Sequence, residues 1–143
     1  MIPSRFNIRV YGILIQEGKI LVTDEIRSGV KMTKFPGGGL EFGEGIVECL
    51  IREFKEELNV KITVKTLFYV NDFYQFSSFN KNEQLISIYY KVSLDEGEIN
   101  TTETPFLFET NEPQCFRWLD LNKINPNDVT FPIDKIVVGK LCV

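Results

Sequence analysis

The chain has 143 residues, of which 43% are hydrophobic and 25% are charged, and its formal net charge is -4. This composition is typical of one soluble globular domain, and no apolar run approaches the ~18 residues of a membrane-spanning helix. We therefore expect a cytoplasmic protein with no membrane partner. The negative net charge argues against binding to a nucleic-acid polymer, because such binding needs a basic surface. The chain contains no histidine, which excludes serine–histidine or cysteine–histidine catalysis and histidine-ligated metals.

The three cysteines, Cys49, Cys115 and Cys142, are odd in number, widely spaced and free of any CxxC pattern. This usage is typical of a reducing compartment and argues against a disulfide framework or a structural zinc site. We expect each cysteine to be a small buried hydrophobic residue.

The expected elements begin with two strands. Residues 6–15 and 20–26 are rich in β-branched and aromatic side chains, and the short turn between them predicts a hairpin. Residues 27–34 are expected to form a loop. The sequence FPGGG at residues 35–39 is expected to interrupt regular structure.

After the glycines, apolar residues at spacings of three and four predict a long helix over residues 46–58. The apolar positions are Val47, Leu50, Ile51, Phe54 and Leu58. The rest of the chain predicts further strands and one terminal helix. The strands span 60–70, 84–94 and 114–121, and the helix spans 131–143 with Pro132 in its first turn. This order indicates an α+β or α/β sandwich in which helices cover a largely mixed sheet.

The predicted helix carries three close carboxylates, Glu53, Glu56 and Glu57, which a helical wheel places on a polar face apart from the apolar stripe. A solvated face is one interpretation, with Glu48 and Arg52 as an i, i+4 ion pair. However, the carboxylates repel one another and lie toward the helix C-terminus, where negative charge is disfavoured. A divalent cation would remove both difficulties, and oxygen ligands suit Mg²⁺ or Mn²⁺.

The glycines that precede the helix could contribute to the same metal site. Gly37, Gly38 and Gly39 let the backbone approach a ligand closely, so that a carbonyl oxygen could join the metal shell. The alternative is a tight turn without a ligand. The segment is not a phosphate-binding P-loop, because no Gly-Lys-Ser/Thr follows it.

The spacing of these residues resembles the Nudix box, the signature of Nudix hydrolases, over residues 38–60. The matching positions are Gly38, Glu44, Arg52, Glu53, Phe54, Glu56, Glu57 and Val60. The one departure is Asn59, where the family has glycine. Asparagine is the next choice for the left-handed turn that ends a helix, so we expect the site to survive. The flanking sequences FPGG and FRWLDL also look like the family.

The resemblance implies a single Nudix domain over residues 1–143, with an α/β/α sandwich in which a mixed sheet lies between helices. It implies hydrolysis, with Mg²⁺ or Mn²⁺, of a pyrophosphate bond in a nucleoside diphosphate linked to another moiety. By similarity, the catalytic residues are Glu53, Glu56 and Arg52, and the metal ligands are Glu53, Glu56 and Glu57 with a carbonyl of Gly37 or Gly38. Arg52 is implied to orient the glutamates, and Glu44 to be structural. Family members also use a later-loop glutamate as base or ligand, and the candidates here are Glu103, Glu109 and Glu112.

Several alternatives stay open at the level of sequence. The substrate could be a nucleoside triphosphate, ADP-ribose, a dinucleoside polyphosphate or a nucleotide sugar, and the protein could be a homodimer. Arg9 and Arg27 could meet phosphates or be surface charges. Four aromatic residues could stack on a base or pack in the sheet: Tyr69, Phe73, Tyr74 and Phe76. The competing functional hypothesis is a Nudix-fold domain that binds or senses a nucleotide without hydrolysing it.

Overall fold

The computed structural model describes residues 2–142, so Met1 and Val143, the ends of the expected domain, lie outside the described residues. Its centre is a seven-stranded mixed sheet in the order β3-β2-β1-β6-β5, with β4 paired to β1 and β7 paired to β2. The strands are β1 (Arg5–Gln16), β2 (Lys19–Arg27), β3 (Val30–Lys34), β4 (Gly37–Gly39), β5 (Lys61–Val70), β6 (Glu83–Glu96) and β7 (Gln114–Asp120). The helices are α1 (Ile46–Leu58), α2 (Pro132–Leu141) and the 3₁₀ turn η1 (Pro126–Asp128).

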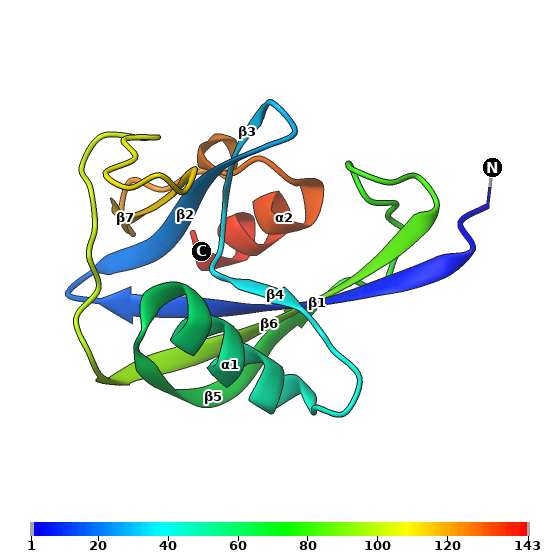
Figure 1. Ribbon diagram of the computed structural model, residues 1–143, viewed down its shortest axis with the longest axis horizontal. Coiled ribbons are helices and arrows are strands. Elements are labelled where there is room, and N and C mark those ends of the chain that lie inside the picture. The colour runs from blue at the N-terminus through cyan, green and yellow to red at the C-terminus, as the bar shows by residue number, and fades with distance from the viewer. Residues whose placement is uncertain (1, 143) are drawn as a thin grey trace.

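Strand β1 runs through the middle of the molecule and separates two hydrophobic cores. It pairs in parallel with β6 and antiparallel with its other neighbours, β2 and β4. Alternate side chains of a strand point to opposite faces. Accordingly, Val10 and Leu14 pack with α1, whereas Tyr11 and Ile13 pack with α2. The two helices therefore cover opposite faces of the sheet, which confirms the predicted α/β/α arrangement (Figure 1).

The prediction of a loop over residues 27–34 is wrong, because residues 30–34 form strand β3, which pairs antiparallel with β2. Ser28 and Gly29 turn the chain with φ angles of 51° and 77°. Two consecutive positive φ angles are the pattern of the tight hairpin turn that matches the twist of a sheet. The Ser-Gly pair was therefore a sequence pattern that indicates a hairpin. Strand β3 ends at Lys34, which is followed by the segment FPGGG.

The glycines at 37–39 were expected to interrupt regular structure, but they form β4, which pairs antiparallel with β1. A Cβ atom at Gly37, where φ is 152°, would lie 2.0 Å from the carbonyl oxygen of Val10. Only glycine permits this close approach of two strands. The glycines thus carry the chain across β1 toward the start of α1.

Two of the three cysteine predictions are confirmed. Cys49 and Cys115 are buried, but Cys142 is exposed, because it follows the last residue of α2 at the surface. Within residues 2–142, no helix is long and apolar enough to cross a membrane.

Candidate functional site

Helix α1 carries the predicted acidic residues, and both of its ends are held by local hydrogen bonds. At the start, Glu48 Oε1 accepts a hydrogen bond from the backbone N–H of Gly45 at 3.2 Å. At the end, Asn59 lies in the left-handed region with φ 54° and ψ 40°, and its N–H donates to the carbonyl of Lys55. The expected geometry of Asn59 is confirmed, and the expected Glu48–Arg52 pair is wrong, because Glu48 caps the helix instead.

The buried face of α1 differs from the predicted stripe. Leu50 and Phe54 are buried as expected, but the third buried position is Cys49, while Val47 and Ile51 are 42% and 38% exposed. The helix is therefore rotated relative to the prediction. As a result, the polar face predicted to lie apart from the core is not separate: Glu53 and Glu57 sit on the side that faces the protein.

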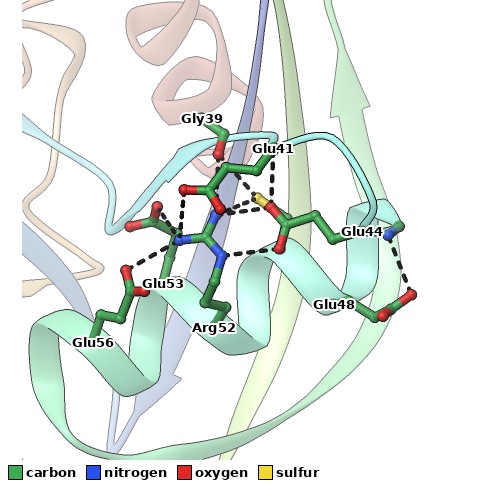
Figure 2. Close-up of polar contacts among 9 residues, drawn as sticks. Gly39, Glu41, Glu44, Glu48, Arg52, Glu53 and Glu56 are labelled. Carbon is green, nitrogen blue, oxygen red and sulfur yellow. Dashed lines mark hydrogen bonds and ion pairs between the residues drawn. The ribbon is translucent and has the colours of Figure 1, made fainter.

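Arg52 lies at the centre of a cluster of carboxylates (Figure 2). It binds Glu44 through two hydrogen bonds, from Nε at 2.9 Å and from Nη2 at 2.8 Å. Its Nη1 donates to Glu53 Oε1 at 3.0 Å and to Glu56 Oε2 at 3.1 Å, and it lies 3.8 Å from Glu41 Oε1. Hydrogen bonds from Arg52 lower the pKa of Glu44 to about 2. Arg52 therefore links the loop before the helix to the carboxylates on it.

The carboxylate of Glu53 packs directly against β4. A Cβ atom at Gly38 would lie 2.3 Å from Glu53 Cδ, so a side chain there would displace the carboxylate. Burial raises the pKa of Glu53, although Arg52 opposes the shift, and the nearby Glu56 adds to it. The single guanidinium of Arg52 thus does not fully compensate the negative charge of Glu53.

Glu57 makes no ion pair with Arg52 among the described residues, and it borders two cavities. Its Oε1 accepts a long hydrogen bond of 3.5 Å from Gln114 Nε2. Burial raises the pKa of Glu57 to about 7; Lys34 opposes the shift, while Glu53 and Glu25 add to it. Glu57 is therefore a second carboxylate whose negative charge the protein leaves poorly compensated.

The candidate ligands do not form a ready-made cage. Across residues 2–142, no group of three acidic, cysteine or histidine side chains is arranged to hold a metal ion. Glu53 and Glu56 instead share Arg52, while Glu57 lines the same cavity as Glu53 without binding Arg52. The donor set is nevertheless one that a hard divalent cation prefers, since it consists only of oxygen atoms. Two of these carboxylates also have raised pKa values, which indicates that a cation would be favourable here.

Next to Glu53 and Glu57 lies the larger cavity, with a volume of about 540 Å³. Its walls come from β1, β2, β3, β4, β6, α1, the loop 71–82 and the start of α2. Among the lining side chains that the sequence did not mark as site residues are Tyr11, Lys34, Tyr89 and Asp134. They are distant in sequence and share no motif, so only the fold brings them together. Lys34 lies at the end of β3, a strand that the sequence analysis did not predict, so the sequence analysis did not mark it.

The aromatic candidates divide into two groups. Phe76 lines the cavity, while Tyr69 packs against Tyr89 with ring centroids 6.3 Å apart. Phe73 and Tyr74 are exposed and do not belong to its lining. A further aromatic residue, Phe79, lines the cavity and contacts Phe131, and the guanidinium of Arg27 lies 4.7 Å from its ring.

Of the three glutamates proposed from the later loop, two border a cavity and one does not. Glu109 and Glu112 border the second cavity, about 440 Å³ in volume, together with Glu57. Glu103 is not part of that lining. The loop is anchored by Asp24 Oδ2, which accepts a hydrogen bond from the backbone N–H of Phe106 at 3.2 Å.

Comparisons with known proteins agree with this architecture. Residues 5–138 match the family model described as the NUDIX domain. Among curated proteins, the mRNA-decapping protein of Variola virus is 34% identical over 71 residues, which cover 48% of this chain and 29% of that protein. The chain thus spans under a third of the length of such relatives.

Solved structures show the same fold at low identity. The MutT NUDIX hydrolase from Burkholderia pseudomallei superposes with a TM-score of 0.71 at 17% identity, covering 95% of this chain and 97% of that chain. A NUDIX hydrolase from Nitrosomonas europaea gives a TM-score of 0.70 at 17% identity, covering 94% and 86% respectively.

Proposed function

The chain belongs to the Nudix hydrolase family, and we propose that it hydrolyses, with Mg²⁺ or Mn²⁺, a pyrophosphate bond in a nucleoside diphosphate linked to another moiety. The observation that carries this proposal is the packing of Glu53 against Gly38, beside a cavity that Glu57 also borders. We further propose a single domain over residues 1–143, located in the cytoplasm, that takes a small-molecule nucleotide.

In this proposal the metal ligands are Glu53, Glu56 and Glu57, with a backbone carbonyl of Gly37 or Gly38. The bound ion would neutralise the diphosphate and polarise the phosphorus that water attacks. Arg52 acts by holding Glu53 and Glu56 in place, and Glu44 fixes Arg52 through its two hydrogen bonds. Arg52 is thus a positioning residue in the proposed reaction.

The proton acceptor is proposed to come from the later loop. Glu109 and Glu112 are favoured over Glu103, because they border the same cavity as Glu57. Comparing Glu109→Gln with Glu112→Gln under single-turnover conditions identifies the acceptor as the variant that loses the hydrolytic step while nucleotide binding is kept.

The central experiment measures phosphate or nucleotide release from a substrate panel with Mg²⁺ and with Mn²⁺. The panel holds nucleoside triphosphates, ADP-ribose, dinucleoside polyphosphates and nucleotide sugars. A capped RNA is included because the Variola virus relative is an mRNA-decapping protein. The acidic net charge of -4 favours the small molecules over the RNA.

Two isosteric variants of α1 make the assay specific. Glu56→Gln removes a proposed ligand and should abolish turnover. Glu48→Gln makes the same charge change on the same helix but only alters the cap, so turnover should persist. Tight nucleotide binding by the wild type without turnover of any panel member would instead support a non-catalytic sensor. Activity that survives chelation of divalent ions would contradict the metal-dependent reaction.

A further inference from the structure

Two cations, Arg9 and Lys34, line the larger cavity, and both lie close to the ring of Tyr11. Arg9 Cζ and Lys34 Nζ are each 5.7 Å from the centroid of the Tyr11 ring. Both residues line the same cavity as Glu53 and Glu57. We refer to Arg9 and Lys34 as the cationic wall of this cavity and to Glu53 and Glu57 as its acidic wall, and Glu25 and Asp134 also belong to the lining.

Arg9 keeps most of its hydrogen-bonding capacity free. Its Nε donates to the hydroxyl of Tyr11 at 3.1 Å, and within residues 2–142 no carboxylate lies within ion-pair distance of its guanidinium. A Cβ atom at Gly39 would lie only 3.4 Å from Arg9 Nη1, so the small glycine leaves room for this side chain beside β4. A guanidinium held by one neutral partner retains N–H groups that can bind an anion in a forked geometry.

Lys34 is only 7% exposed, and its Nζ lies 3.0 Å from Glu25 Oε2. Burial disfavours its charge, but Tyr11 and Glu25 outweigh that effect and raise the pKa of Lys34 overall, so the side chain stays charged. Glu25 is the carboxylate in ion-pair contact with Lys34, and the charges of both cations also act on the buried Asp134 of α2. The protein thus holds a second positive charge close to Arg9 without a second carboxylate paired to it.

We propose that Arg9 and Lys34 form an anion subsite that binds the diphosphate group of the substrate through the oxygen atoms that do not contact the metal. This inference rests on the proposed function and assigns the cationic wall of the same site. Arg9 supplies the forked hydrogen bonds, and Lys34 supplies charge at short range. Tyr11 orients Arg9 through its hydroxyl, which accepts the hydrogen bond from Arg9 Nε.

The test measures binding rather than turnover. Imidodiphosphate, a diphosphate that resists hydrolysis, is titrated by calorimetry into the protein in saturating Mg²⁺. Arg9→Gln should weaken its binding by about ten- to a hundredfold, as expected when a hydrogen bond to a charged group is lost. Arg9→Lys, which keeps the charge but loses the fork, should give an intermediate loss. The matched control is Lys65→Gln, which removes an exposed positive charge from β5 and should bind like the wild type.

Lys34 is tested together with its partner, because removing Lys34 alone would leave Glu25 buried and unpaired. The double variant Glu25→Gln/Lys34→Gln removes both charges and should still weaken imidodiphosphate binding at least severalfold. Mn²⁺ binding without diphosphate provides a readout that a general structural defect would not reproduce. Arg9→Gln should bind Mn²⁺ as tightly as the wild type or more tightly, because it removes a positive charge near Glu53.

Equal imidodiphosphate affinity in the wild type and Arg9→Gln overturns the inference, as does parallel loss of diphosphate and Mn²⁺ binding. No measurable binding to the wild type also overturns it. If diphosphate binding falls as expected but no nucleotide is ever hydrolysed, the anion subsite stands and the proposed hydrolysis fails. If nucleotides are hydrolysed with an unchanged KM in Arg9→Gln, the hydrolysis stands and the subsite fails.

Discussion

Replacing Asp134 by asparagine should change how the stability of the protein depends on pH. Asp134 lies in the first turn of α2 and is 2% exposed, and Tyr89 donates a hydrogen bond to its carboxylate. Burial raises the pKa of Asp134 from its ordinary value of 3.8 to about 6, while the Tyr89 hydrogen bond and the charges of Lys34 and Arg9 oppose the shift. The folded protein therefore holds this proton more tightly than the unfolded chain does.

The sign of the effect follows from proton linkage. Between about pH 4 and pH 6 the folded state keeps the proton that the unfolded state has released, so the free energy of unfolding falls as pH rises. Above about pH 6 Asp134 is ionised in both the folded and the unfolded state, so the free energy of unfolding falls no further. A shift of about 2 pKa units at 1.36 kcal/mol per unit gives a total of about 3 kcal/mol. Asp134→Asn cannot ionise, and its amide oxygen can still accept from Tyr89.

Urea unfolding of the wild type and Asp134→Asn at pH 4, 5, 6, 7 and 8 measures the difference. The variant should gain stability relative to the wild type from pH 4 to pH 6, by up to about 3 kcal/mol, and the difference should then stay constant. Asp72→Asn, the same substitution at an exposed aspartate, is the matched control. A difference between Asp134→Asn and wild type that does not vary with pH would refute the assignment of a buried, proton-holding carboxyl.

Three further substitutions test other parts of the structure. Gly38→Ala places a Cβ atom 2.3 Å from Glu53 Cδ, and this should reduce turnover at least about tenfold with little change in thermal unfolding, because the carboxylate must move. Asn59→Ala should lower the free energy of unfolding by about 1 kcal/mol in urea titrations, since alanine tolerates the left-handed region poorly. Asp24→Asn breaks the buried ion pair with Arg117 and should cost about 3–5 kcal/mol in the same titrations; a loss below 1 kcal/mol would contradict that role.

The acidic helix was the part of the site most accessible from sequence. Its bounds, residues 46–58, and the left-handed end at Asn59 were predicted correctly because they depend on local spacing and backbone preference. Its orientation was not, because hydrophobic periodicity alone did not reveal which apolar residues the sheet would cover. Cys49 was the missing signal: its side chain is buried, and including it shifts the buried face toward Glu53 and Glu57.

The cavity could not be predicted by the same means. Lys34 and Asp134 are 100 positions apart, and each looks like an ordinary charged residue in its own segment. They line one cavity because β3 pairs with β2, and α2 packs on the face of the sheet that bears Tyr11 and Tyr89. Long-range strand pairing is the information that a single sequence does not display. The glycine strand β4 was missed for a related reason, since its partner β1 lies about 30 positions earlier.

The balance of charge around α1 explains why a divalent cation and a diphosphate anion are proposed for the same site. Arg52 carries one positive charge and contacts Glu44, Glu53 and Glu56 within 3.1 Å, so that cluster keeps a net negative charge. In the same cavity, Arg9 has no carboxylate in ion-pair contact within the described chain. A divalent cation alone would satisfy only the acidic wall, and an anion alone would be repelled by it. The two walls are satisfied together only when a cation and a diphosphate enter the cavity as a pair, and this predicts that Mg²⁺ and imidodiphosphate each bind more tightly in the presence of the other.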